Sequence, residues 1–540
     1  MLNTYQCCYY RDQGVSKLKS FMKKKAIPLL LLFVLIILTG CQSIGGVDLN
    51  KMLVNQMISE SLEGTMSLKL TLTPDESAEA NPETLDMIKA INGLQIVVES
   101  YKQQDLETMS AKGKLVIHRG EIPFQLSVSQ TDMVMQIEGA DVPIIIPMDS
   151  AVDPLSELSG MDGSSDLAMD SLQEKAITQS LVTLIVKHLE NPKDLTVERV
   201  TESVYGESLS LFKIHSEIKG PEMLTLFKKS LRNLVMDDQG MKQFIAQLYD
   251  VMEASASEED DNLFGLGLGF GNPGSTDREL EIEFIHTFIK QGLLTFLMML
   301  EDESMLSGLD PVLNDNTYFR SDLYVDSSLN VRKSDFELSI TPEVAQQEEL
   351  EGISSVQIEG HGEFWNHNKT VIADLLTYDA EDVLHMKDTS SLDDDFISGL
   401  DRESVLYKLL KEDLHATKKT AVFYTDYDYD YESYLPYELA IIKNGVMAVP
   451  ARSLADGLGL QLDWNGVTRE ITLTSPYDGT TIALKVDSNE ATIDGATQTM
   501  PLATFISNGQ TYVPLRFITD ALGAELEWIA ETSSAVVTME

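Results

Sequence analysis

The amino-acid sequence predicts a multidomain α+β protein, with antiparallel sheets, packed helices and a C-terminal duplicated hairpin-helix-hairpin domain. Three observations predict this class. A length of 540 residues exceeds one compact unit at roughly 150 residues per domain. Runs of apolar residues at every second position alternate with runs at helical spacing. Residues 449–474 also recur as residues 513–538 without a gap.

Composition restricts the class of protein further. The chain has 43% hydrophobic and 23% charged residues, which excludes wholesale disorder, a collagen-like fibre and a multi-span membrane protein. It carries 40 Lys and Arg against 86 Asp and Glu, a formal charge of -46. This charge repels phosphate backbones at long range, so we expect no nucleic-acid partner.

The first 40 residues have the pattern of a secretory signal peptide. Three lysines, Lys23 to Lys25, precede the apolar residues 26–38. As a helix this apolar run is about 20 Å long, too short for a hydrocarbon core of roughly 30 Å. The sequence leaves open whether the start is Met1 or Met22.

The apolar run ends in Leu38-Thr39-Gly40-Cys41, which resembles the bacterial lipobox. In a lipobox the cysteine thiol receives a diacylglyceryl group and the signal peptide is cut just before that residue. The resemblance implies lipidation at Cys41 and a membrane anchor at the extracytoplasmic face of the cell membrane. The alternative is an ordinary cleaved signal with a chance cysteine. Since Cys7 and Cys8 lie before the cut, Cys41 would have no disulfide partner within the mature chain.

Residues 41–253 form the first predicted α+β portion. The spacing of apolar residues over 66–72 is typical of a half-buried strand, and several similar runs follow it. Helical spacing then appears over 177–189, and a second helix is predicted from 221 to 252 with a break near Gly240.

Residues 254–277 are rich in Ser, Glu and Asp and then in Gly, which predicts a flexible linker or loop. No Walker lysine accompanies these glycines, so they do not indicate a phosphate site. Residues 278–420 form the second α+β portion, with a helix over 279–300 whose start also suits a strand. Whether the two portions form one domain stays open.

Residues 421–436 alternate tyrosines with acids, which favours an extended connector over an adhesive or cation-binding strip. The C-terminal domain is assigned to residues 437–540. Each copy of its repeat begins with a tight-turn signal, Asn444-Gly445 or Asn508-Gly509. A Val-Pro-x-Arg motif then opens a short helix that a Leu-Gly pair closes. The identical pairs are Val449/Val513, Pro450/Pro514, Arg452/Arg516, Asp456/Asp520, Leu458/Leu522, Gly459/Gly523, Leu462/Leu526, Trp464/Trp528, Thr468/Thr532 and Thr474/Thr538.

These residues resemble the copper amine oxidase N-terminal-like domain, or stalk domain, which is frequent in secreted proteins of Gram-positive bacteria. The match is clearest at residues 512–516 and 521–524 and weaker at 449–452 and 457–459. The resemblance covers a fifth of the chain and does not imply the oxidase activity. Such an oxidase needs a cofactor tyrosine and three copper-binding histidines, but no histidine occurs after residue 415. We expect no cofactor and no metal.

Two sets of residues are candidate site residues. His361 and His367 flank Glu363 and Trp365 on a predicted strand whose odd positions share one face. Metal binding is one interpretation, but satisfied or exposed strand histidines are the default, so no metal ligand is assigned.

The repeated residues Arg452/Arg516 and Trp464/Trp528 also have two interpretations. We expect each tryptophan to fold back over its helix as core and each arginine to cap carbonyls or pair with an acid. The alternative is a glycan-stacking surface.

The sequence contains no Gly-x-Ser-x-Gly elbow, no His-Glu-x-x-His helix and no catalytic cysteine in the mature chain, so no catalytic residue is assigned. We expect a non-enzymatic, lipid-anchored surface protein that binds or scaffolds in the bacterial cell envelope, with a cell-wall or envelope component as partner. The alternative is a carrier of a lipid or other apolar ligand in a cavity of the central body. Residues 47–415 faintly resemble the lipoprotein-carrier superfamily, in which a curved antiparallel sheet wraps helices around an apolar cavity.

Overall fold

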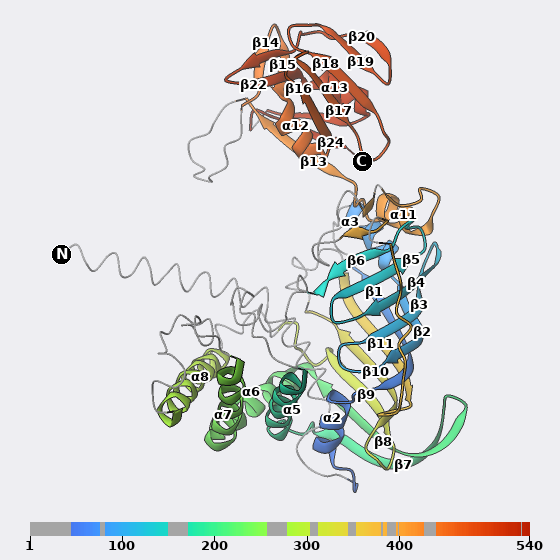
Figure 1. Ribbon diagram of the computed structural model, residues 1–540, viewed down its shortest axis with the longest axis vertical. Helices are drawn as coiled ribbons and strands as arrows, with labels where there is room; N and C mark the ends of the chain where they lie inside the picture. Colours follow the sequence, from blue (N-terminus) through green and yellow to red (C-terminus); the bar gives the residue numbers. More distant parts are fainter. Residues whose placement is uncertain are drawn as a thin grey trace, which may run out of the picture. The chain divides into compact units, whose positions relative to one another are not determined.

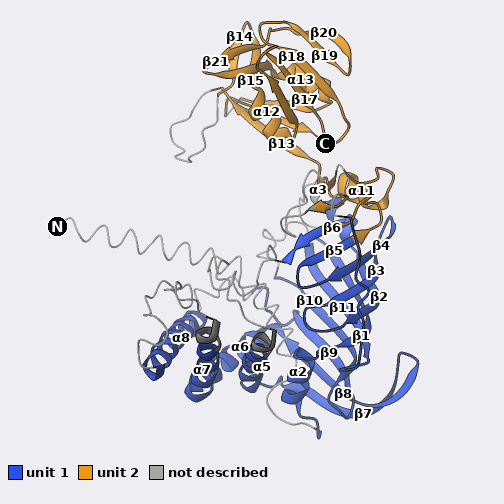
Figure 2. Cartoon of the chain, in the orientation of Figure 1, with its two compact units in different colours: residues 1–135, 145–378 blue, residues 136–144, 379–540 orange. Residues whose placement is uncertain are grey.

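The computed structural model describes residues 45–75, 82–148, 171–255, 278–302, 311–343, 353–379, 382–385, 396–397, 399–425, 439–530 and 532–539. The predicted signal peptide, Cys41 and most of the linker 254–277 lie outside the described residues. The chain divides into two compact units, one of residues 1–135 and 145–378 and the other of residues 136–144 and 379–540 (Figure 2).

A large sheet, most of whose strands belong to the first unit, has the strand order β12-β6-β5-β4-β3-β2-β1-β11-β10-β9-β8-β7 (Figure 1). Every neighbouring pair from β4 to β7 is antiparallel. The strands are β1 (Leu62–Pro74), β2 (Gln95–Gln103), β3 (Met109–Ile117), β4 (Gly120–Val128), β5 (Asp132–Ile137), β6 (Ile144–Pro147), β7 (Asp194–Val204), β8 (Glu207–Lys219), β9 (Tyr318–Val325), β10 (Val331–Ile340), β11 (Ile353–Trp365) and β12 (Leu384–His385).

The first and the last long strands of this sheet pair at its centre. Glu63 of β1 lies opposite Trp365 of β11, and the pairing continues along both strands. Strands from both predicted α+β portions therefore lie in one sheet, which answers the question that the sequence leaves open.

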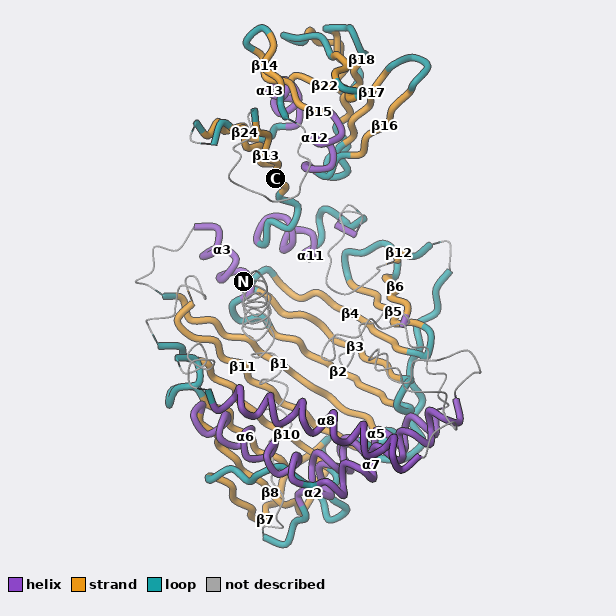
Figure 3. The backbone as a smooth tube through the Cα atoms, turned by 90° about the vertical axis from the view of Figure 1, so that its left-hand side faces the viewer, coloured by secondary structure: helices purple, strands orange, loops and turns teal. Residues whose placement is uncertain are grey.

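The period-two pattern gives the sheet one apolar and one polar face. On β1, Leu70 lies opposite Ile358, whereas Lys69 lies opposite Glu359 and points to the other side. Figure 3 shows the helices α5 to α8 across one face of the sheet. The helices of this unit are α2 (Leu49–Met57), α3 (Pro82–Ile91), α5 (Ser171–Lys187), α6 (Gly220–Met236), α7 (Asp238–Ser255) and α8 (Arg278–Glu301).

Two sequence predictions about helices can be compared with the structure. The predicted helix 221–252 is two helices, and the break falls at Asp237, close to Gly240. Residues 278–301 are helical, so the strand alternative for the start of this segment is wrong. Acidic residues in the first turn of α8, Glu279 and Glu281, suit the positive end of a helix dipole.

Helices α2 and α6 cover the β8–β9 end of the apolar face. Met223 and Leu226 of α6 pack with Ile218 and Phe319, which are fully buried. Leu49 and Met52 of α2 close the neighbouring cluster around Ile214, Leu323 and Val325. Helices α7 and α8 pack on the other helices in turn.

The C-terminal part of the second unit contains three small sheets, β13-β24-β23, β14-β15-β22-β21 and β16-β17-β18-β19-β20. A single core joins them through α12 and α13. The elements are α11 (Val405–Lys408), η3 (Leu409–Asp413), β13 (Lys419–Tyr424), β14 (Ile441–Lys443), β15 (Val446–Pro450), α12 (Ala451–Leu458), β16 (Gln461–Asn465), β17 (Glu470–Thr474), β18 (Thr481–Lys485), β19 (Glu490–Ile493), β20 (Ala496–Thr499), β21 (Phe505–Ser507), β22 (Gln510–Pro514), α13 (Leu515–Leu522), β23 (Glu525–Ile529) and β24 (Ser534–Met539).

The turn residues adopt the conformations that the sequence predicts. Asn444 and Gly445 have φ of 53° and 77°, and Asn508 and Gly509 have 52° and 80°. Gly459 and Gly523 end α12 and α13 in the left-handed conformation.

The predicted connector 421–436 needs a correction at its start. Residues 421–424 belong to β13, which pairs with β24, and Ala421 and Phe423 are buried in the domain core. The acids and tyrosines further along concealed this short alternating run.

Candidate functional site

The apolar face of the main sheet is covered to different degrees along a single row of paired residues. Ile218, Phe319, Leu338, Ile358 and Leu70 lie opposite one another on β8, β9, β10, β11 and β1. The first two are fully buried, whereas the last three are only partly buried. Cover by the helices therefore decreases from β8 towards β1.

Beyond this row the same face continues over β1 to β4 with large apolar side chains. Leu68 is 37% exposed and the others are partly buried. We call this surface the central apolar face; it consists of Met66, Leu68, Leu70, Ile96, Val98, Leu115, Phe124, Leu126 and Ile358. Five strands at about 4.8 Å spacing make it about 20 Å wide.

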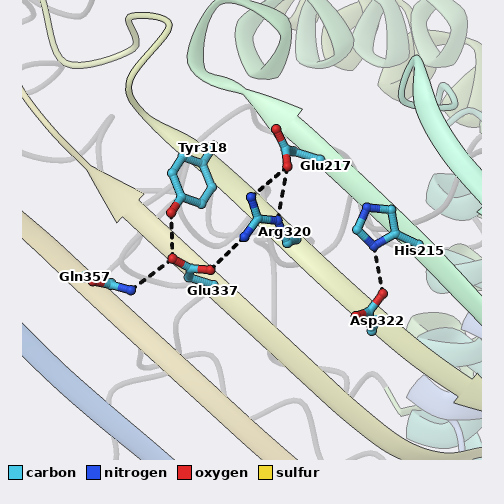
Figure 4. A network of polar contacts seen from close by, with 7 residues as sticks. All are labelled: His215, Glu217, Tyr318, Arg320, Asp322, Glu337 and Gln357. Carbon is cyan, nitrogen blue, oxygen red and sulfur yellow. Dashed lines mark hydrogen bonds and ion pairs between the residues drawn. The ribbon is translucent and has the colours of Figure 1, made fainter.

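The polar face of the same sheet contains a network of charged side chains (Figure 4). Arg320 donates to Glu217 Oε2 from Nε at 3.0 Å and from Nη2 at 2.9 Å, and its Nη1 donates to Glu337 at 3.0 Å. The other oxygen of Glu337 accepts from Tyr318 and from Gln357. The hydrogen bond to Glu337 raises the pKa of Tyr318, and the one to Glu217 raises the pKa of Arg320.

A second row on the polar face contains two histidine–aspartate pairs. His215, Asp322, Asp335 and His361 lie opposite one another on β8 to β11. The Nδ1 atom of His215 is 2.7 Å from Asp322, and that of His361 is 2.6 Å from Asp335. Ser67 of β1 lies opposite His361 in the same row.

This row borders a hollow of about 440 Å³ whose lining includes Lys69, Arg320, Asp335, Glu359 and His361. Lys69 pairs with Glu359 at 3.3 Å, so acids and bases in the lining neutralise one another. Serine, histidine and aspartate occur here in the order of a hydrolytic triad, but among the described residues no hydrogen bond joins Ser67 to His361. A triad needs that bond to activate the nucleophile. Ser67 is therefore not activated by His361 in this arrangement.

The prediction that His367 shares the strand and the face of His361 is wrong. Strand β11 ends at Trp365, and the chain then turns at Asn366, whose φ is 55°. Burial, followed by the nearby Arg332, lowers the pKa of His367. The described part of the chain contains no group of three His, Cys, Asp or Glu side chains placed to hold a metal ion.

Two consecutive aspartates at the α6–α7 junction form a separate cluster of charges. Asp237 accepts from Lys187 Nζ at 2.6 Å, from His188 Nε2 at 2.9 Å and from the Gly240 amide at 2.9 Å. These contacts, the Lys187 hydrogen bond first, lower the pKa of Asp237 to about 2.

The neighbouring Asp238 is held from the other side of the junction. It accepts from Lys290 and, at 3.1 Å, from His286 of α8. Asp237 and Asp238 therefore connect the α6–α7 junction to α5 and to α8, which indicates that they have a structural role.

The expectation that the repeated tryptophans are core residues is wrong. Trp464 is 45% exposed and Trp528 is 49% exposed. Both lie near the ends of edge strands, β16 and β23, where little of the domain extends over the ring. The indole nitrogen of Trp464 lies beside Gly466 at the hairpin turn. Arg452 and Arg516 are exposed, and within the described residues neither guanidinium forms an ion pair.

Sequence comparison relates one part of the chain to known proteins. No helix within the described ranges is both long and apolar enough to cross a bilayer. No curated protein matches the sequence. Residues 431–537 match the family of the copper amine oxidase N-terminal domain, a non-catalytic domain, which confirms the resemblance predicted for the C-terminal end of the chain.

Proposed function

We propose that the chain is a non-enzymatic binding protein, anchored by a lipid on Cys41 at the extracytoplasmic face of a bacterial membrane, that carries a lipid or another apolar ligand on its central sheet. The broader alternative is a scaffold in the cell envelope without such a ligand. One observation favours the carrier, namely the partly exposed central apolar face.

The free energy of burial supports a ligand at this face. Large apolar side chains in contact with water are unfavourable by about 25 cal/mol per Å² of surface, and contiguous patches of this kind mark ligand or partner sites. Helices α2 and α6 bury this face at β8 and β9 but leave it partly exposed from β1 to β4.

The dimensions of the face favour an acyl chain as the occupant. Half of a hydrocarbon core of about 30 Å is about 15 Å, the length of an acyl chain in one leaflet. The central apolar face, about 20 Å wide, is long enough to hold it. A protein held at a membrane by its own lipid would also encounter such ligands at high local concentration.

A fluorescent fatty acid titrated into the purified protein tests this proposal. The variant Leu68→Glu places a charge on the central apolar face and should weaken binding at least tenfold. The matched control is Ser67→Glu, since Ser67 is the adjacent residue and points to the polar face. This control should bind like the wild type.

Two results would contradict the carrier. If the wild type binds no fatty acid, the face is occupied by another part of this chain or by a partner. If both variants bind equally well, the probe binds elsewhere. Mass spectrometry of organic extracts of the purified protein gives an independent check, because a carrier should retain lipid.

A further inference from the structure

We propose that the C-terminal domain binds a neutral glycan through the exposed rings of Trp464 and Trp528. The C-terminal domain belongs to a different unit from the central apolar face, so glycan binding there does not depend on the carrier. Two large indole rings are exposed at corresponding positions, 64 residues apart, in the repeat. Tryptophan is highly buried on average in folded proteins, so two exposed rings at corresponding positions call for an explanation.

The backbone presents both rings in the same way. Each tryptophan follows its helix-closing glycine by five residues and lies on the first strand after the helix. In both cases this strand is at the edge of its sheet. Each tryptophan lies opposite a buried residue of the next strand, Ile471 or Ala535, so its side chain leaves the strand on the same face as that residue. The exposed part of each ring remains available to a ligand.

The surroundings of Trp464 suit a sugar better than a protein partner. Every residue from Asp463 to Glu470 is exposed, and most of them are polar. A stable protein interface buries about 800 Å² per partner around a contiguous apolar centre. A pyranose ring needs less, because its CH groups stack on one aromatic face while its hydroxyl groups bond to nearby polar groups.

The net charge of the domain indicates which class of glycan it can bind. Residues 439–540 contain five Lys and Arg and twelve Asp and Glu. An acidic domain repels anionic polymers, so the chemistry favours a neutral chain. On a polymer long enough to reach both rings, binding at one ring raises the effective concentration of the chain at the other.

Intrinsic tryptophan fluorescence of the full-length protein can report binding directly. The chain has three tryptophans, and the third, Trp365, is stacked on Tyr205 at 3.8 Å in the other unit. The variant Trp365→Phe leaves only the two candidate rings as indole reporters and is the matched control. Oligomers and polymers of β-1,4-linked N-acetylglucosamine are the probes, with anionic alginate for comparison.

The expected result is a saturable change in fluorescence with the neutral oligomer and none with alginate. Replacing either Trp464 or Trp528 by Ala should weaken binding to the polymer at least tenfold, and replacing both should abolish it. The control Trp365→Phe should bind like the wild type. Melting temperatures should stay close to that of the parent, since both rings are half exposed.

Several outcomes would overturn the proposal. One is binding that persists when both rings are removed, and another is a wild type that responds to no neutral glycan. If the alanine variants unfold the domain, the corresponding Trp→Phe variants distinguish a binding role of the rings from a structural one. The proposal requires these variants to fold and to bind with intermediate affinity. Phe variants that fold and bind as tightly as the wild type, next to Ala variants that unfold, would show that the rings are structural.

Discussion

Replacing Asp237 by Asn should weaken the helical layer at neutral pH and have little effect in strong acid. The carboxylate is only 15% exposed and accepts hydrogen bonds from Lys187, His188 and the Gly240 amide. An asparagine oxygen can keep the bond to Gly240, but it loses the charge that attracts the lysine.

The magnitude follows from the lowered pKa of Asp237. The difference between 3.8 and about 2 corresponds to about 2 kcal/mol at 1.36 kcal/mol per pH unit, and residual solvent contact reduces this to roughly 1–2 kcal/mol. Because the folded-state pKa lies below the unfolded one, this stabilisation is complete above about pH 3.8. It is lost as the pH falls through about 2.

Thermal unfolding at a series of pH values measures this effect. At pH 7 the transition of the first unit should fall by roughly 2–4 °C in Asp237→Asn, and the difference should shrink below pH 3. The matched control is Asp238→Asn, whose carboxylate is 53% exposed and should contribute less. Equal melting temperatures of the two variants at pH 7, or an undiminished deficit of Asp237→Asn at pH 2, would show that the Asp237 carboxylate does not stabilise the helical layer in this way.

Three further predictions concern other parts of the chain. Cys41→Ala should leave the protein unlipidated and released, or retained as precursor, and unchanged membrane fractionation would contradict the lipobox. Residues 437–540, extended to include β13, should fold alone without copper; elemental analysis and circular dichroism check this, and stoichiometric copper would oppose it. Gly113→Ala should cost about 1–3 kcal/mol in denaturant unfolding, because the new Cβ would lie 2.1 Å from the Val97 carbonyl oxygen. Gly292→Ala, with open space around it in α8, should instead be neutral or stabilising.

Local patterns in the sequence predict local structure well in this chain. The alternation over residues 66–72 predicts a strand because side-chain direction in a strand depends only on neighbours in sequence. The Asn-Gly pairs predict their turns for a similar reason, since positive φ is a local preference.

Other features depend on residues that are distant in sequence. Nothing in the alternation of β1 specifies β11 as its partner, so the local patterns do not predict the single large sheet. The pairs of His215 with Asp322 and of His361 with Asp335 follow from that same pairing of strands. The exposure of Trp464 depends on the position of its strand at the edge of a sheet, which a repeat in the sequence does not encode.

The pairing of β1 with β11 also has a consequence for how the chain can fold. Residue 74 ends β1 and residue 353 begins β11, so β1 has no partner on one side until almost 280 further residues exist. At 5–20 residues per second, synthesis of that interval takes roughly 15–60 s. During this time the edge of β1 and its apolar side chains are exposed to other chains, a known route to aggregation. We therefore expect β1 to remain prone to pairing with a wrong strand until β11 is available to it.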